Sequence, residues 1–198
     1  MEIFSDIIHG IKCDDDTLIE AKELYQKFLD KFEKHPGWEQ DNHSLSDHTF
    51  KSNILIENDC EKINTSITQC LFQYLEMLNH SPESVEGFAI TESWLTHTVE
   101  GEYARQHNHG TADVSGVYYI QSNPKTDGSI YFLAPETIRT AHPLYRFMHS
   151  QHDIEAHENT MILFPGWMPH GTRVHKGDEP RIHLVVDVEA NEDMRAMC

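Results

Sequence analysis

His107 and His109 are the first residues in the chain whose type and spacing suggest chemistry. They lie two positions apart in the segment from Gln106 to Gly110. On a β-strand, residues i and i+2 project to the same face, so two imidazoles at this spacing would point to one side. Neutral imidazole binds iron, zinc, copper and nickel, and two such ligands at a strand end can begin a mononuclear metal site. The alternative is that both are polar residues on a solvent-facing strand edge.

A third histidine and an arginine follow further along the chain. The sequence Leu-Phe-Pro-Gly-Trp-Met-Pro-His ends a hydrophobic strand with a turn and delivers His170. Arg181 comes eleven residues later, after a second turn, and opens another hydrophobic strand. An antiparallel hairpin of this length would bring His170 and Arg181 to neighbouring positions, where the guanidinium offers a planar fork for a carboxylate. In the simpler alternative, His170 caps the turn and Arg181 pairs with Asp178 or Glu179 on the surface.

The elements that position these residues begin with a helical region over 1–86. Thr17 and Glu20 have the spacing of a capping box, and apolar residues recur at helical spacing from Leu18 to Phe32. A second amphipathic stripe runs from Ile63 to Leu78. Both patterns predict helices that pack one face against a core.

From residue 87 onward, short segments rich in β-branched and aromatic residues predict strands separated by turns. The predicted strands are Phe88–Thr98, Glu102–His107, Val114–Gln121, Ser129–Leu133, Met161–Phe164 and Arg181–Val188. Several short strands after two helices indicate an α+β fold in which N-terminal helices buttress a jelly roll. The length of 198 residues predicts one domain over 1–198, with mainly helical support over 1–86 and a jelly-roll core over 87–190 that carries the site.

Two polar segments carry other histidines. The segment 38–49 contains His43 and His48 and is expected to be a solvated loop, with a role of these histidines as ligands as the alternative. A polar insertion over 134–160 contains His142, His149, His152 and His157; we expect surface residues there, with a role in a lid as the alternative.

The composition of the chain disfavours some classes of binding partner. The net charge is -18, and residues 1–100 carry most of it, with 7 Lys and Arg against 20 Asp and Glu, which disfavours nucleic-acid binding. No run approaches the ~18 apolar residues of a membrane span, and no signal peptide is expected at the N-terminus. The four cysteines are scattered, so we expect reduced thiols and a cytoplasmic protein.

Four motifs in a fixed order resemble a known superfamily. They are the His-x-His pair, Ser-Gly-Val-Tyr-Tyr-Ile, Gly-Ser-Ile-Tyr-Phe, and Leu-Phe-Pro-Gly-Trp-Met-Pro-His followed by Pro-Arg-Ile. Together they resemble the iron- and 2-oxoglutarate-dependent oxygenases, and more narrowly the prolyl-hydroxylase-like subfamily of oxygenases with a His-x-His motif. The resemblance covers roughly residues 88–190 and implies a double-stranded β-helix, the jelly roll of these enzymes.

The resemblance also implies roles for single residues. His107 and His170 would be metal ligands for Fe(II), and Arg181 would hold the far carboxylate of the co-substrate 2-oxoglutarate. Tyr119 falls where prolyl-hydroxylase-like members place a phenol on that carboxylate; the alternative is a core aromatic. The implied reaction consumes 2-oxoglutarate and O2, releases succinate, and hydroxylates an unidentified substrate, either a protein side chain or a small metabolite.

His109 departs from the superfamily pattern, which has a carboxylate at this position. The i, i+2 spacing favours His109 as the third ligand, and Asp113 is the alternative if it folds back from the loop. Three neutral imidazoles would also suit Zn(II) with an open position. Two other functions therefore stay open, a cupin-like three-histidine metalloenzyme that does not use 2-oxoglutarate and a non-catalytic metal-binding jelly-roll module.

Overall fold

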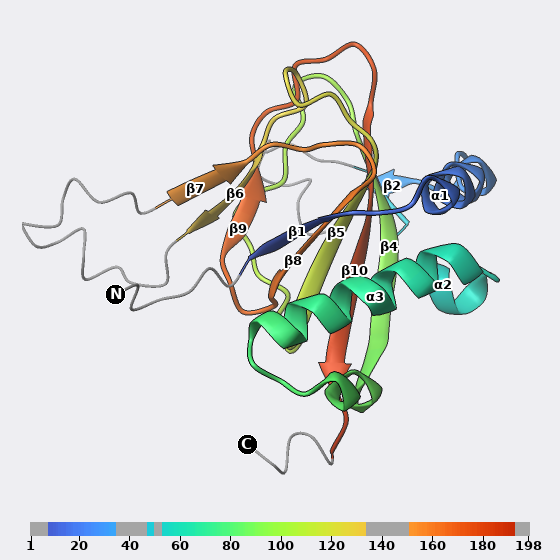
Figure 1. Cartoon of the computed structure of the whole chain (residues 1–198). Coiled ribbons are helices and arrows are strands. Elements are labelled where there is room, and N and C mark those ends of the chain that lie inside the picture. The colour runs from blue at the N-terminus through green and yellow to red at the C-terminus, as the bar shows by residue number, and fades with distance from the viewer. Residues whose placement is uncertain (1–7, 35–46, 50–52, 134–150, 193–198) are drawn as a thin grey trace, which may run out of the picture.

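Two antiparallel β-sheets carry the site, and helices cover one face of the larger sheet (Figure 1). The computed structural model of the chain describes residues 8–34, 47–49, 53–133 and 151–192. The helices are α1 (Asp15–Lys27), α2 (Ile54–Glu57), α3 (Glu61–Met77) and a 3₁₀ helix at Pro82–Gly87. Among the described residues, no helix has the length and apolar character needed to cross a membrane.

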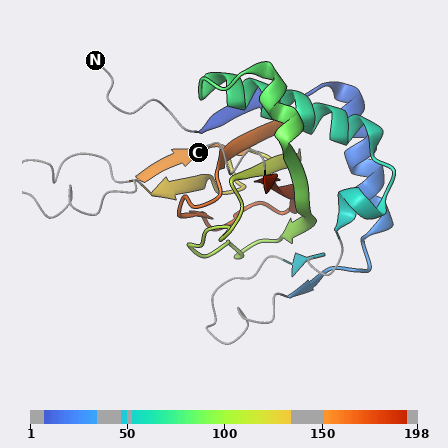
Figure 2. The same cartoon turned by 90° about the horizontal axis from the view of Figure 1, so that it is seen from below.

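The larger sheet has seven strands in the order β1-β8-β5-β10-β4-β3-β2, and the smaller has three in the order β7-β6-β9. Their bounds are β1 His9–Lys12, β2 Glu33–Lys34, β3 Asp47–His48, β4 Phe88–Thr98, β5 Val114–Gln121, β6 Ile130–Leu133, β7 Gln151–Ile154, β8 Thr160–Pro165, β9 His170–Thr172 and β10 Arg181–Ala190. β1, β2 and β3 come from the region before residue 87, so that region adds strands as well as helices to the fold. Figure 2 shows the helices gathered on one side of the sheets.

Alternation along the strands gives the larger sheet two different faces. On β10, the even positions Ile182, Leu184, Val186 and Val188 belong to a core shared with α1 and α3. The odd positions His183, Val185 and Asp187 line a cavity on the opposite face. A second apolar cluster, which includes Val117, Ile162 and Phe164, lies on that inner side with β6. The outer face therefore anchors the sheet on the helices, and the inner face is available for chemistry.

Two predictions from local sequence patterns, a capping box and a strand, were wrong because contacts with distant parts of the chain determine the structure there. Thr17 and Glu20 do not form a capping box: the Thr17 hydroxyl hydrogen-bonds Ser66, and the Glu20 carboxylate accepts from the backbone N–H of Ile63. Both side chains join α1 to α3, and α1 ends at Lys27. The predicted strand Glu102–His107 is a loop that lies along β9, through a bridge between His107 and His170 and hydrogen bonds between Ala104 and Thr172.

The hairpin predicted between His170 and Arg181 is also absent. β9 pairs with β6 in the smaller sheet, whereas β10 pairs with β4 and β5 in the larger one. The two segments are nevertheless close, because Nη2 of Arg181 donates to Oγ1 of Thr172 at 3.0 Å. The predicted insertion over 134–160 contains β7 and the start of β8; residues 134–150, with His142 and His149, lie outside the described part.

Candidate active site

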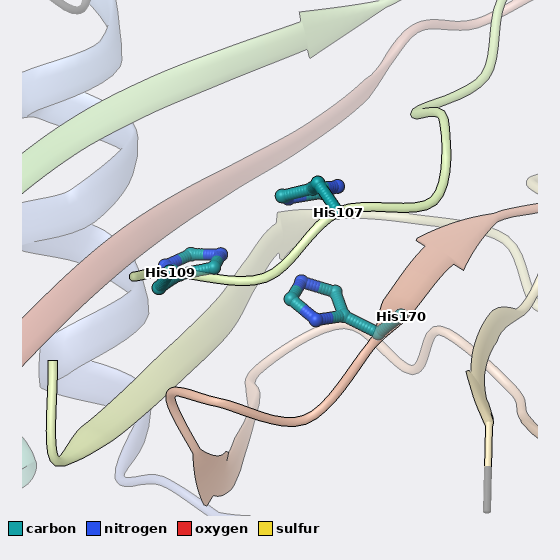
Figure 3. Close-up of side chains that lie close together, drawn as sticks. All are labelled: His107, His109 and His170. Carbon is teal, nitrogen blue, oxygen red and sulfur yellow. The ribbon is translucent and has the colours of Figure 1, made fainter. Parts of the chain in front are cut away.

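His107, His109 and His170 form one cluster, with a potential ligand atom of each within 4.8 Å of the other two. His107 and His109 lie in the loop before β5, and His170 begins β9 (Figure 3). The ring centroids are 4.4 Å apart for His107 and His170, 5.0 Å for His109 and His170, and 5.3 Å for His107 and His109. Three side chains, two from a loop and one from a strand about sixty residues later in the sequence, thus converge on one point.

Each imidazole of the cluster is fixed by a hydrogen bond at Nδ1. Nδ1 of His107 lies 2.7 Å from the carbonyl of Arg105, and Nδ1 of His170 lies 2.9 Å from the carbonyl of Met168. Because a carbonyl oxygen can only accept, Nδ1 must carry the hydrogen in both rings, which leaves the lone pair on Nε2. This is the tautomer that a metal ligand needs.

His109 is fixed in the same way by a carboxylate. Its Nδ1 lies 2.5 Å from Oδ1 of Asp187, and Trp94 stacks on its ring at a centroid distance of 5.7 Å. Asp113, the alternative third ligand, lies elsewhere: its Oδ2 accepts from the backbone N–H of Ala190 at 2.8 Å. Asp113 is not part of the histidine cluster, so the structure brings together the three histidines and leaves Asp113 aside.

The loop that carries His109 is held against β8. The backbone N–H of His109 donates to the carbonyl of Gly166 at 2.8 Å, and Gly166 in turn donates to the carbonyl of Asp113. A Cβ at position 166 would collide with the backbone of Ala112, so only glycine permits this approach. The turn after β8 therefore positions His109 as well as His170.

A cavity of about 450 Å³ opens beside the cluster. Its lining includes the three histidines, with Trp94 and Glu92 from β4, Tyr119 from β5 and His183 from β10. Burial and the neighbouring His107 lower the pKa of His170 to about 3. His170 therefore remains neutral, as a ligand must be, even in mildly acidic solution.

Beyond the cluster, the buried polar atoms without a hydrogen-bond partner among the described residues include Oη of Tyr119, Nε of Arg181 and Nδ1 of His183. Tyr119 and His183 are paired across β5 and β10, with ring centroids 5.8 Å apart. Burial raises the pKa of Tyr119 to about 12, and the nearby Arg181 guanidinium opposes this shift. An unsatisfied buried polar group costs about 1–3 kcal/mol, so this group of atoms is suited to an anionic ligand.

Arg181 is fully buried and donates to Thr172, a residue that lines the cavity. Nη1 donates to the backbone carbonyls of Asp127 and Gly128, and Nη2 contacts Oγ1 of Thr172 at 3.0 Å and Oγ1 of Thr98 at 3.4 Å. The alternative, a surface pair with Asp178 or Glu179, is wrong because the guanidinium points inward. Its Nε has no hydrogen-bond partner among the described residues.

Two further histidines line this cavity, namely His48 and His183, and neither was placed there from the sequence. His48 was expected in a solvated loop, but β3 pairs with β4 and its ring is buried, with Nδ1 3.2 Å from the hydroxyl of Thr96. His183 could have been found, because it lies two positions after Arg181 on the same strand and so shares its face. His152 and His157 are exposed, as expected, and His43 lies outside the described residues.

Residues 92–187 match the family model described as "Putative 2OG-Fe(II) oxygenase". This stretch contains the histidine cluster, Tyr119 and Arg181. No curated protein sequence matches the chain.

Solved structures share the fold at low sequence identity. A prolyl-4-hydroxylase from Pseudomonas putida is 13% identical, with a TM-score of 0.64 and 94% of each chain covered. A prolyl hydroxylase from Trichoplax adhaerens, in complex with a hypoxia inducible factor peptide, is 14% identical, with a TM-score of 0.64 and coverage of 98% of this chain and 87% of that chain. The epimerase SnoN from nogalamycin biosynthesis, in complex with Fe3+, alpha ketoglutarate and nogalamycin RO, is 12% identical, with a TM-score of 0.68 and coverage of 93% and 79%.

These matches confirm the predicted α+β double-stranded β-helix. The family model, the fold and the three-histidine cluster agree with the resemblance of the sequence to the Fe(II)- and 2-oxoglutarate-dependent oxygenases.

Proposed function

We propose that His107, His109 and His170 bind Fe(II) through their Nε2 atoms. The observation that supports this most strongly is that all three Nδ1 atoms are already engaged, with two carbonyls and one carboxylate. Three imidazole nitrogens with open positions beside them suit iron, and the same donors would accept zinc or nickel. When bound, the iron supplies the activation of O2 that is coupled to decarboxylation of 2-oxoglutarate to succinate and to hydroxylation of the substrate.

The far carboxylate of 2-oxoglutarate would bind at Arg181 and Tyr119. The phenol hydroxyl of Tyr119 and Nε of Arg181 both need an acceptor, and both are buried where water is excluded. A carboxylate satisfies such donors and is itself stabilised by the guanidinium, whereas either partner alone would be costly to bury. Arg181 therefore both binds the co-substrate and fixes its orientation toward the histidines.

The primary substrate would bind in the cavity, whose lining includes Trp94 and the exposed Glu92. A protein side chain is our first proposal and a small metabolite is the second, since solved structures of the same fold hold a peptide in one case and nogalamycin RO in another. The buried free thiols of Cys13, Cys60 and Cys70 support a reducing, cytoplasmic location.

The test is anaerobic titration of the purified protein with Fe(II) and then with 2-oxoglutarate, followed by succinate formation after O2 is admitted. One metal ion and one 2-oxoglutarate per chain, with succinate as product, are expected. If metal binds and 2-oxoglutarate does not bind at millimolar concentration, the protein is a three-histidine metalloenzyme of the cupin-like kind. If no metal binds, the assignment of the cluster is wrong.

A further inference from the structure

Asp187 is a buried carboxylate that lies directly behind His109. Its Oδ1 is 2.5 Å from Nδ1 of His109 and accepts a second hydrogen bond of 2.7 Å from the hydroxyl of Ser115. The side chains of His109 and Asp187 are only 4% and 9% exposed. Two donors from different segments therefore hold one carboxylate oxygen at a fixed place next to the candidate third ligand.

The sheet determines where this carboxylate lies. Asp187 is in β10, between Glu92 of β4 and Ser115 of β5. It lies on the inner face with His183 and Val185, and the register with β4 shifts immediately after it. Strands paired on both sides leave little freedom for the backbone, so Asp187 is aimed at His109 by the fold rather than by a mobile loop.

A ligand set of three histidines lacks a negative charge, and the Asp187 carboxylate carries one. Three imidazoles bring no charge to a divalent ion, whereas the superfamily pattern places a carboxylate where His109 stands. A carboxylate hydrogen-bonded to the outer nitrogen of a ligating histidine fixes the ring and makes the inner nitrogen a stronger donor. Asp113 does not meet this need, because its carboxylate accepts from the backbone of Ala190.

We infer that Asp187 is a positioning residue that supplies, through His109, the negative charge that the three-histidine ligand set lacks. The charge of the usual carboxylate ligand is kept in this protein but lies one side chain further from the metal. The inference rests on the proposed function, in that His109 must be a ligand.

The first test separates charge from hydrogen bonding. Asp187→Asn keeps an oxygen that can accept from His109 but removes the charge, and Asp113→Asn removes the same charge from a carboxylate outside the cluster. Affinity for Co(II), and its visible absorption, which reports the ligand field, are measured on the full chain without co-substrate. Asp187→Asn should bind about 10- to 100-fold more weakly and with a changed spectrum, as loss of such partners typically does. Asp113→Asn should match the wild type, and Asp187→Glu should retain more affinity than Asp187→Asn.

The second test moves the negative charge from position 187 to the ligand position 109. His109→Asp places a carboxylate at the ligand position but leaves Asp187 beside it, and two close carboxylates repel each other. His109→Asp combined with Asp187→Asn removes that repulsion, so the double variant should bind Co(II) more tightly than His109→Asp alone. A residue with a merely structural role would give the opposite order, because each change would add its own damage.

The outcomes distinguish this inference from the proposed function. If the wild type binds no metal, both are wrong. If the wild type binds metal, His107→Ala does not, and Asp187→Asn behaves like Asp113→Asn, only the role of Asp187 is overturned. Thermal unfolding of each metal-free variant shows whether it is folded. If Asp187→Asn is unfolded, Asp187→Ser, which also removes the charge, replaces it, and unchanged affinity and spectrum in that variant would overturn the inference.

Discussion

The backbones of His107 and His170 donate hydrogen bonds to each other's carbonyl oxygens, at 2.9 Å in both directions. This isolated antiparallel bridge joins the loop before β5 to the start of β9. The two imidazoles are therefore brought together by the backbone itself, before any metal binds. A site built in this way loses little conformational entropy when it takes up its ion.

We predict that His107→Ala and His170→Ala each abolish stoichiometric Fe(II) binding while the metal-free protein stays folded. The bridge uses only backbone atoms, so both variants can keep it. Anaerobic titration measures the binding, and thermal unfolding of the metal-free proteins measures the stability. Undiminished binding in both variants would remove the metal site from this location.

Asp113→Ala and His109→Ala should differ in their effects on metal binding. The Asp113 carboxylate accepts a hydrogen bond from the backbone N–H of Ala190, whereas His109 belongs to the histidine cluster. We expect His109→Ala to lower the metal affinity strongly and Asp113→Ala to lower only the stability, by about 1 kcal/mol for the lost hydrogen bond. A metal-bound crystal structure with Asp113 on the ion would contradict this.

Arg181→Ala should weaken 2-oxoglutarate binding and leave the metal in place. Truncating one member of a buried charge pair costs ~2–5 kcal/mol, which corresponds to roughly 30-fold or more. The fold should also lose stability, because the carbonyls of Asp127 and Gly128 lose their donor. Calorimetry measures the binding of zinc and then of 2-oxoglutarate to the zinc-substituted protein. Tyr119→Phe is the milder variant: it should weaken 2-oxoglutarate binding by about 1 kcal/mol and change the fold little.

Two buried histidines should make the metal-free protein sensitive to acid. Burial lowers the pKa of His183, helped by Arg181, and burial with His107 lowers that of His170 to about 3. In the unfolded chain both titrate near 6.5, so below that pH the unfolded state binds protons that the folded state does not. The free energy of unfolding should fall as the pH falls, by up to about 1.4 kcal/mol per pH unit for each histidine.

Urea unfolding at pH 7.0 and 5.5 checks this, with His183→Gln as the matched variant. The loss of stability between the two pH values should be smaller in His183→Gln than in the wild type, by about 1 kcal/mol. Equal losses would mean that His183 is not held neutral by the fold.

The sequence predicted β4 and β5 to the residue, because both are long and rich in β-branched and aromatic side chains. Ordered motifs also predicted that His107, His109 and His170 lie together, as they do. Their role as ligands and the role of Arg181 stay predictions. It could not predict that His48 lines the cavity, because this depends on the pairing of β3 with β4, almost fifty residues away in sequence. Asp187 was missed for a similar reason: a polar residue near a strand end reveals its partner only through the register with β5.

β10 places four side chains of the site at every second position, namely Arg181, His183, Val185 and Asp187. Substitution of any one of them alters the contacts of that side chain and leaves the other three side chains on the inner face. Deletion of a single residue between Arg181 and Asp187 would instead turn part of the strand over and exchange inner for outer side chains. The length of this strand is therefore under a stricter constraint than the identity of any one residue in it, and variants of this protein should accept substitutions in β10 far more readily than changes in its length.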